Sequence, residues 1–471
     1  MMKIQGKKKT FLLFIAGYAI VFAMMFIGIR EDYMILETAA LCGGGCILLL
    51  LRRPAWIIYL MIFYCCVEKW MISQFGMPDS LDLAMDLMML LCLGLALKTL
   101  FEKNDRYYFV FPLVLAGAFF VIGTLSALFQ QVDILLICWS YRNLMRFFLF
   151  FFSCVVILDV DDVENLMRLF SWLFHANILI VSFQFWIQGY SQDNLGGLFG
   201  TQMGCNGYMN TYLCIYVSFV CVMYMARRLS FWIFLYVSAG SLYIAALSEL
   251  KFWFMEYVLI LAVSILLTRF SSRTILMLIG AAAGLFIGLQ LFNAVFPGWE
   301  FSVNQILDYT GQGGYSTETD LNRLTAISRI CNEFLHTISQ RLFGFGLGSC
   351  ETSTFFNSGF FQQYGETIHY TYLLQAFLFL ETGFVGLFLY LGFYISISAK
   401  ALIMRRFLDE TAQIYCGTAA ICAVTCILQV FYNSALRVEN SGYLAYFMLA
   451  VPFIFMKGRS GEENDESIKK D

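Results

Sequence analysis

Long apolar runs separated by short polar breaks extend over most of the sequence. Fourteen of them have about the length, roughly 17 to 25 residues, that an α-helix needs to cross a bilayer core of about 30 Å. We predict spans at residues 11–29, 34–51, 55–73, 81–98, 107–129, 143–158, 166–188, 207–225, 230–247, 252–268, 274–296, 383–399, 411–431 and 441–457. A membrane β-barrel would show short segments of alternating polarity instead. The pattern predicts an all-α, polytopic integral membrane protein with about 12–14 transmembrane helices.

Composition supports this class and excludes others. Hydrophobic residues make up 60% of the 471 residues and charged residues 13%, whereas a typical soluble domain has about 25% charged residues. The net charge is −3 and there is no basic arm, so nucleic acid is not predicted as a partner. The cysteines lie mostly inside apolar runs and lack the spacing of metal ligands, so neither a metal site nor a cofactor is predicted.

The Lys and Arg residues predict the orientation of the chain. If the N-terminus is cytoplasmic, 20 of the 30 basic residues fall on the cytoplasmic side and 7 on the outer side. This asymmetry follows the positive-inside rule. We therefore expect a multi-pass protein of the cytoplasmic membrane with both termini cytoplasmic. Residues 1–456 form the predicted membrane domain, and 457–471 a disordered cytoplasmic tail.

The segment 297–369 is the longest polar break. Connections longer than about 15 residues are usually functional or disordered. This one has apolar residues at helical spacing, which favours an ordered extracytoplasmic loop with helices. These residues are Leu321, Leu324, Ile327, Cys331, Phe334 and Ile338. Within the loop, "FGFGLGSC" predicts a tight, close-packed turn. Another outer segment, 130–143, is too short to span and is predicted to lie in the membrane interface.

Arg142 and Arg146 are four residues apart and therefore share a helix face near the outer end of a span. Two guanidinium groups that point the same way suit a diphosphate, which they can bind through bidentate, charge-assisted hydrogen bonds. Alternatively, the two side chains reach the lipid headgroups or pair with Asp133. The sequence leaves both interpretations open.

His369 is the histidine at the predicted boundary between the large loop and the membrane, near Glu366. A histidine can accept and return a proton at neutral pH, so it is a candidate catalytic group. The alternative is an interfacial histidine that makes one hydrogen bond. The apolar run after it is predicted to lie along the outer membrane face. Acidic residues within spans form a rival set that could line an ion path: Glu37, Glu68, Asp82, Asp86 and Glu256.

Several segments, in order, resemble those of the bacterial O-antigen ligase and Wzy-type polysaccharide polymerase superfamily. They are "GLFGTQMGCNGYMN" with Asn206, "LSELK" with Lys251, "LNRLTAISRICNEFLHTISQRLFGFGLGS" with Arg323, and "IHYTYLLQAFLFLETGFVG" with His369. Together they cover about residues 140–400. The chain departs from the family pattern at Tyr370, where the family has Asn. Without the resemblance, Lys251 is interpreted as a helix-end lysine that reaches for water and whose charge Glu249 could neutralise.

The resemblance implies a GT-C-like, metal-independent membrane glycosyltransferase. Its donor would be an oligosaccharide linked to undecaprenyl diphosphate, and other partners would be membrane lipid and further polysaccharide assembly proteins. His369 and Arg323 would be catalytic. The substrate-binding residues would be Arg142, Arg146, Lys251, Asn206 and Glu366. A polymerase is favoured over a ligase of O-antigen or wall glycan, and the competing class is a lipid-glycan flippase or another secondary transporter.

Overall fold

The computed structural model describes residues 53–78, 81–102, 109–268, 270–297, 319–353 and 356–468. The chain divides into two compact units, Met1–Ile58 and Tyr59–Asp471. The predicted spans at 11–29 and 34–51 lie outside the described residues, as does part of the large loop.

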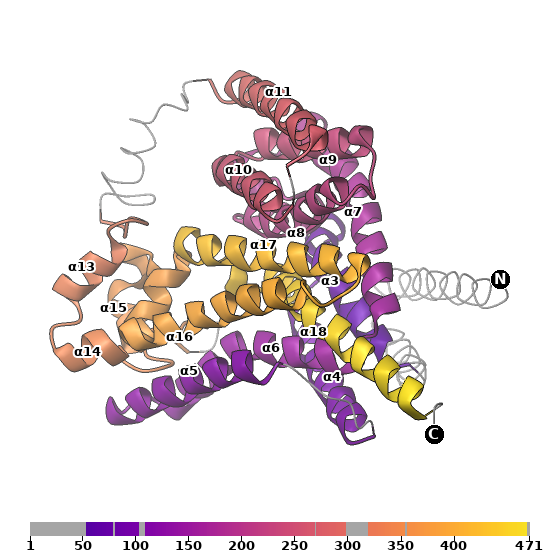
Figure 1. Ribbon diagram of the computed structural model, residues 1–471. Coiled ribbons are helices and arrows are strands. Elements are labelled where there is room, and N and C mark those ends of the chain that lie inside the picture. Colours follow the sequence, from indigo (N-terminus) through magenta and orange to yellow (C-terminus); the bar gives the residue numbers. More distant parts are fainter. Residues whose placement is uncertain are drawn as a thin grey trace, which may run out of the picture. The chain divides into compact units, whose positions relative to one another are not determined.

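Each of the other twelve predicted spans coincides with a helix (Figure 1). In the described residues, nine helices are long and apolar enough to cross a membrane, and the β structure is one isolated bridge. These findings confirm the prediction of a helical, membrane-embedded protein. The helices are α3 (Ala55–Phe75), α4 (Asp82–Glu102), α5 (Val110–Phe129), α6 (Ile134–Ile157), α7 (Val160–Trp186), α8 (Cys205–Met225), α9 (Phe231–Leu247), α10 (Lys251–Leu266), α11 (Ser272–Val295), α13 (Ala326–Glu333), α14 (Ile338–Phe343), α15 (Gly359–Ile368), α16 (Leu374–Met404), α17 (Glu410–Tyr432) and α18 (Glu439–Ile468).

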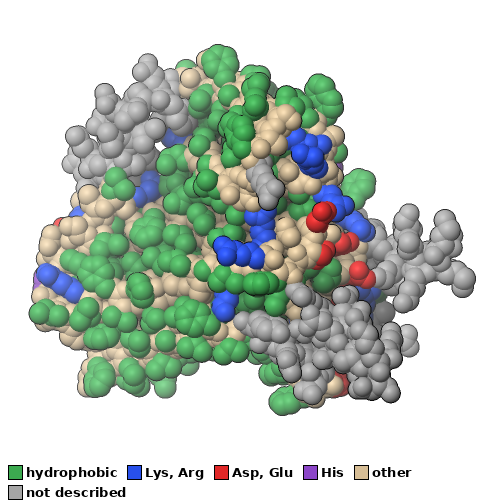
Figure 2. All heavy atoms as spheres, viewed as in Figure 1, with side chains coloured by type: hydrophobic (Ala, Val, Ile, Leu, Met, Phe, Trp, Pro, Cys, Tyr) green, Lys and Arg blue, Asp and Glu red, His purple; other side chains and the backbone are tan. Residues whose placement is uncertain are grey.

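Large apolar side chains remain exposed along these helices, among them Leu90, Phe111 and Phe388. Figure 2 shows one face on which hydrophobic side chains dominate, while Lys and Arg form a few separate groups. An exposed apolar surface of this extent is costly in water and suits contact with lipid. The surface therefore agrees with the membrane class.

α6 begins earlier than predicted. The Asp133 carboxylate accepts a hydrogen bond from Leu135 N at 2.8 Å and caps the helix, which then continues to Ile157 without interruption. Most of the segment 130–143, which is predicted to lie in the membrane interface, forms the first turns of α6. Arg142 and Arg146 consequently lie within one continuous helix.

The central packing joins α16 to α5 and α17, and α18 to α6 and α17. α16 itself is interrupted at Gly383, which has φ 61° and ψ −161°. The nine residues before this break, Leu374–Thr382, are all buried. The prediction that they lie along the membrane face is therefore wrong. Their apolar side chains are covered by neighbouring helices rather than by lipid.

The helical spacing found in the large loop corresponds to two short helices, α13 and α14, and Thr337 begins the second with a capping box to Gln340. At the other end of the chain, α18 continues to Ile468, through the segment predicted as a disordered tail. Figure 1 shows α13, α14 and α15 beside the start of α16.

The glycine-rich turn inserts between α5, α6 and the broken helix α16. Phe345 N and Gly346 N donate to the carbonyl oxygens of Leu380 and Glu381, each at 2.8 Å. Gly344, Gly346 and Gly348 all have positive φ, and a Cβ on any of them would lie 2.2 to 2.6 Å from backbone atoms of α16, α5 or α6. The prediction of a close-packed turn is confirmed. Glycine is required here because both the conformation and the space exclude a side chain.

We expect Gly344→Ala to destabilise the fold by more than about 3 kcal/mol, because it combines an unfavourable φ with a backbone clash. Gly359→Ala is the matched control, because a Cβ there meets nothing within 4 Å. Thermal unfolding of both variants in detergent micelles measures the difference. Equal stability of the two variants would show that the turn is not tightly held.

Candidate functional site

A cavity of about 260 Å³ lies where the first half of α6 meets the start of α18. Its size is below the range of about 300–1,000 Å³ that is usual for small-molecule sites, so it suits a headgroup rather than a whole glycan. The large loop and the 3₁₀ turns Tyr370–Tyr372 and Ala435–Arg437 complete its walls. The lining residues are Trp139, Arg142, Asn143, Arg146, Thr352, Thr371, Ser434, Arg437, Val438 and Glu439.

Arg142 and Arg146 both line this cavity, as their shared helix face predicts. Arg142 donates from Nε to Asp86 Oδ2 at 2.8 Å, and its guanidinium also lies over the ring of Trp139. Arg146 forms an ion pair with Glu439 and is nearly buried, with 7% of its side chain exposed. The alternative of pairing with Asp133 is not what is observed, because Asp133 caps α6.

Arg437 is a third guanidinium of the cavity, and the sequence analysis did not identify it. It forms an ion pair with Glu351, whose side chain is completely buried. Glu351 Oε2 also accepts from Asn143 Nδ2 at 3.1 Å. The ring of Phe377 lies 3.7 Å from the centre of the Arg437 guanidinium. These contacts hold Arg437 firmly beside the two arginines of α6.

Glu381 fixes the loop residues that precede Glu351, and so positions the part of the cavity wall around Arg437. Its Oε1 accepts from Gly348 N and Cys350 N, both at 3.0 Å, and its Oε2 accepts from Ser140 Oγ at 3.3 Å. The carboxylate thus joins α16 to α6 and to the residue preceding Glu351. Burial raises the pKa of the Cys350 thiol well above its ordinary value, so this cysteine stays protonated at neutral pH and is a poor nucleophile.

The cavity is balanced in charge as it stands. Its three arginines pair with Asp86, Glu439 and Glu351. Even so, Arg146 Nε and Arg437 Nε have no hydrogen-bond partner among the described residues. Buried guanidinium groups normally use their donors fully. These two Nε atoms are themselves buried, so a ligand with several acceptor oxygens competes with the three carboxylates for the terminal guanidinium nitrogens.

His369 and Arg323 are not among the residues that line the cavity. His369 ends α15 in the left-handed conformation, with φ 46°, and its Nδ1 lies 2.8 Å from Asp320 Oδ1. Arg323 donates from Nε to the carbonyl oxygen of Tyr432 at 2.8 Å. Thr371, two residues after His369, does reach the cavity. The loop thus places His369 two residues before a residue that lines the cavity, and Arg323 at the end of α17.

The remaining predicted binding residues lie apart from this cavity. Asn206 is buried and donates to Asp193 Oδ1 at 2.9 Å and to the Ser248 carbonyl at 3.0 Å. Lys251 pairs with Glu249 at 2.8 Å, in agreement with the simpler interpretation of this residue. Glu366 is exposed on α15. None of the three lines the cavity.

Three described members of the rival set of acidic residues, Asp86, Glu68 and Glu256, have separate partners. Asp86 is held by Arg142, Glu68 accepts from Asn440 Nδ2 at 3.1 Å, and Glu256 accepts from Asn210 and Gln429. Glu37 and the side chain of Asp82 lie outside the described residues. In the part of the chain that the structure describes, no group of three His, Cys, Asp or Glu residues could hold a metal ion.

Comparison with known proteins adds no relative. The sequence matches no protein-family model, and no curated protein matches it significantly. The resemblance to polysaccharide polymerases and ligases rests on the quoted motifs alone. The geometry of the cavity must therefore carry the functional argument.

Glu351 is expected to be a stability determinant of the cavity. Glu351→Gln removes the counter-charge of Arg437, whose side chain is only 13% exposed, so we expect a loss of about 3–5 kcal/mol. Glu333→Gln, in the exposed pair with Arg329, should cost less than about 1 kcal/mol. Chemical denaturation of both variants in micelles compares them. A loss confined to Glu333→Gln would contradict this assignment.

Proposed function

We propose that the protein is a membrane glycosyltransferase that uses an undecaprenyl-diphosphate-linked glycan as donor, most simply a polysaccharide polymerase. The observation that carries the proposal is the convergence of Arg142, Arg146 and Arg437 on one small cavity. In this proposal the cavity binds the diphosphate, and the glycan extends out of it. The GT-C-like fold and the outward orientation of the cavity belong to the same proposal.

Three arginines suit the leaving group of this reaction. As the glycosidic bond to the diphosphate breaks, negative charge develops on the phosphate oxygen. Guanidinium groups fixed around that position stabilise the charge without a metal ion. Bidentate geometry favours arginine over lysine for this role.

In this proposal, the carboxylates that pair with the arginines determine which hydrogen bonds the diphosphate must replace. Asp86 and Glu439 occupy the arginine donors that a diphosphate needs. Asp86 is partly exposed, and its contact with Arg142 is therefore the easier one to exchange. The diphosphate displaces Asp86 from Arg142 in this proposal, while the buried Glu351 keeps Arg437 in place.

His369 keeps its proposed role as the proton acceptor, with a changed geometry. Its Nδ1 is engaged by Asp320, an arrangement that orients the ring. Because the attacking hydroxyl must lie within hydrogen-bond reach of the base, the proposal requires the donor's anomeric carbon and the acceptor hydroxyl to meet beside His369, next to Thr371, while the diphosphate lies in the arginine cavity. Arg323, Asn206, Lys251 and Glu366 would then contact the glycan chains rather than the diphosphate.

A ligase of the same family is the first alternative, because it differs only in the acceptor. Loss of the gene distinguishes the two: a polymerase mutant accumulates single repeat units on lipid, and a ligase mutant accumulates full polymers. A transporter is the second alternative. The buried Glu256, held between Asn210 of α8 and Gln429 of α17, favours it, because ionisable groups inside membrane bundles often mark ion paths.

Arg142→Lys tests the diphosphate site. Lysine keeps the charge but loses the bidentate geometry, so we expect transfer to fall about tenfold or more, at equal protein level. Arg406→Lys, on an exposed arginine that lines no described cavity, is the control. The readout is polymer length on the cell surface, together with binding of undecaprenyl diphosphate by the purified variants. Normal polymer and normal binding with Arg142→Lys would reject the site.

His369→Asn separates chemistry from structure at the histidine. Asparagine tolerates the left-handed conformation that ends α15, so stability should be nearly unchanged. Loss of general-base catalysis should lower transfer by about 10²–10⁴ while donor binding remains. His336→Asn, on an exposed loop residue, should be neutral. If His369→Asn retains transfer, the residue is structural and the base lies elsewhere.

A further inference from the structure

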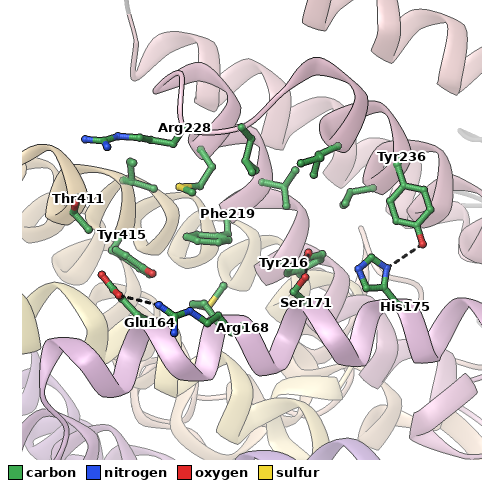
Figure 3. A pocket seen from close by; sticks show the side chains of 17 residues that line it. Glu164, Arg168, Ser171, His175, Tyr216, Phe219, Arg228, Tyr236, Thr411 and Tyr415 are labelled. Atoms are coloured by element: carbon green, nitrogen blue, oxygen red, sulfur yellow. Dashed lines mark hydrogen bonds and ion pairs between the residues drawn. The ribbon is translucent and has the colours of Figure 1, made fainter. Parts of the chain in front are cut away.

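A second cavity, of about 590 Å³, lies between α7, α8, α9 and α17 (Figure 3). It uses Thr411, Ile414 and Tyr415 in the first turns of α17, whereas the arginine cavity uses Ser434 just beyond the last residue of that helix. From Thr411 to the end of α17 is about 30 Å at 1.5 Å per residue. The two cavities therefore lie at opposite ends of one candidate membrane span.

The dimensions of this cavity match one leaflet of a bilayer. Its lining residues on α7 run from Glu164 to His175, which is about 16 Å along the helix. Half of a hydrocarbon core of about 30 Å is close to this length. The middle of the cavity is walled by apolar side chains: Met167, Val220, Met223, Ile233, Val237 and Ile414.

Polar groups lie at both ends but differ in kind. At one end, His175 Nδ1 lies 3.0 Å from Tyr236 OH, and both side chains are exposed (Figure 3). At the other end, Arg168 and Arg228 border the opening. Their partners are Glu164 at 3.5 Å and Glu410 at 2.7 Å, and the side chains of the arginines are 70% and 50% exposed.

These exposed ion pairs are weak and exchangeable, because water screens them. An anionic headgroup can therefore bind Arg168 and Arg228 without the cost of breaking a buried pair. Arg227, exposed next to Arg228, adds positive charge at the same opening. Basic pockets between membrane helices at the cytoplasmic side are typical sites for anionic lipid headgroups. The predicted orientation places this opening on the cytoplasmic side.

We propose that this cavity binds an anionic glycerophospholipid, with the phosphate at Arg168 and Arg228 and an acyl chain along α7 toward His175. The lipid fills the space between α7 and the first turns of α17 and joins the two helices. This site is separate from the transfer reaction, so it stands whether or not the protein is a glycosyltransferase.

The test is binding of dioleoyl phosphatidylglycerol to the purified full-length protein in detergent, followed by native mass spectrometry and thermal unfolding. We expect saturable binding that raises the unfolding temperature, with dioleoyl phosphatidylcholine binding at least tenfold more weakly. The double variant Arg168→Gln/Arg228→Gln should lose at least tenfold in affinity. Ile233→Trp should block the acyl-chain path while leaving both arginines intact.

Lys400→Gln/Arg406→Gln is the matched control, since it removes the same charge from residues outside the cavity. Equal weakening by the control variant would overturn the proposal, as would equal binding of phosphatidylcholine. Unchanged binding of phosphatidylglycerol by Ile233→Trp would show a site without an acyl chain and would also overturn it. Preferential binding of a polyprenyl monophosphate would assign the cavity to an isoprenoid lipid instead.

Discussion

The arrangement of the candidate site depends on one buried carboxylate, that of Glu381, at the break in α16. It accepts two backbone hydrogen bonds from the glycine-rich turn and one from Ser140 of α6. A buried carboxylate is tolerated only where its oxygens are satisfied in this way. The turn is therefore held against two helices at once, and its next residue, Glu351, is presented to Arg437. The large loop, α6 and the start of α18 meet because the Glu381 carboxylate fixes the glycine-rich turn between them.

The same arrangement explains why the arginine cavity is both rigid and selective. A carboxylate that cannot leave, Glu351, holds one arginine, while a partly exposed one, Asp86, holds another. An incoming anion has to compete with Asp86 for the donors, so a weakly charged or single-oxygen ligand gains little. A ligand with several phosphate oxygens can bind more than one of the guanidinium groups at once. The proposed site thus favours ligands with several negative charges over simple anions.

The membrane spans could be predicted because hydropathy is a local property of each segment, and the shared face of Arg142 and Arg146 because helix geometry is local too. Arg437 and Glu439 could not be identified, because their partners lie 86 and 293 residues away along the chain. A short polar break at 432–440, on the predicted outer side, was the available signal. His369 was recognised by its residue type and position, but its contact with Asp320 and its distance from the arginines are set by loop packing that has no periodic pattern.

The long sequence separation between Arg146 and Glu439 has a consequence for biosynthesis. At about 5–20 residues per second, the 293 residues between them take roughly 15–60 s to synthesise. During this interval α6 enters the bilayer with two arginines, each of which costs about 2.5–3.5 kcal/mol near the centre of a helix. Asp86 of α4 is already made, whereas Glu439 is not. Asp86, which pairs with Arg142 in the finished protein, is thus also the counter-charge available to α6 while the nascent chain is still being inserted.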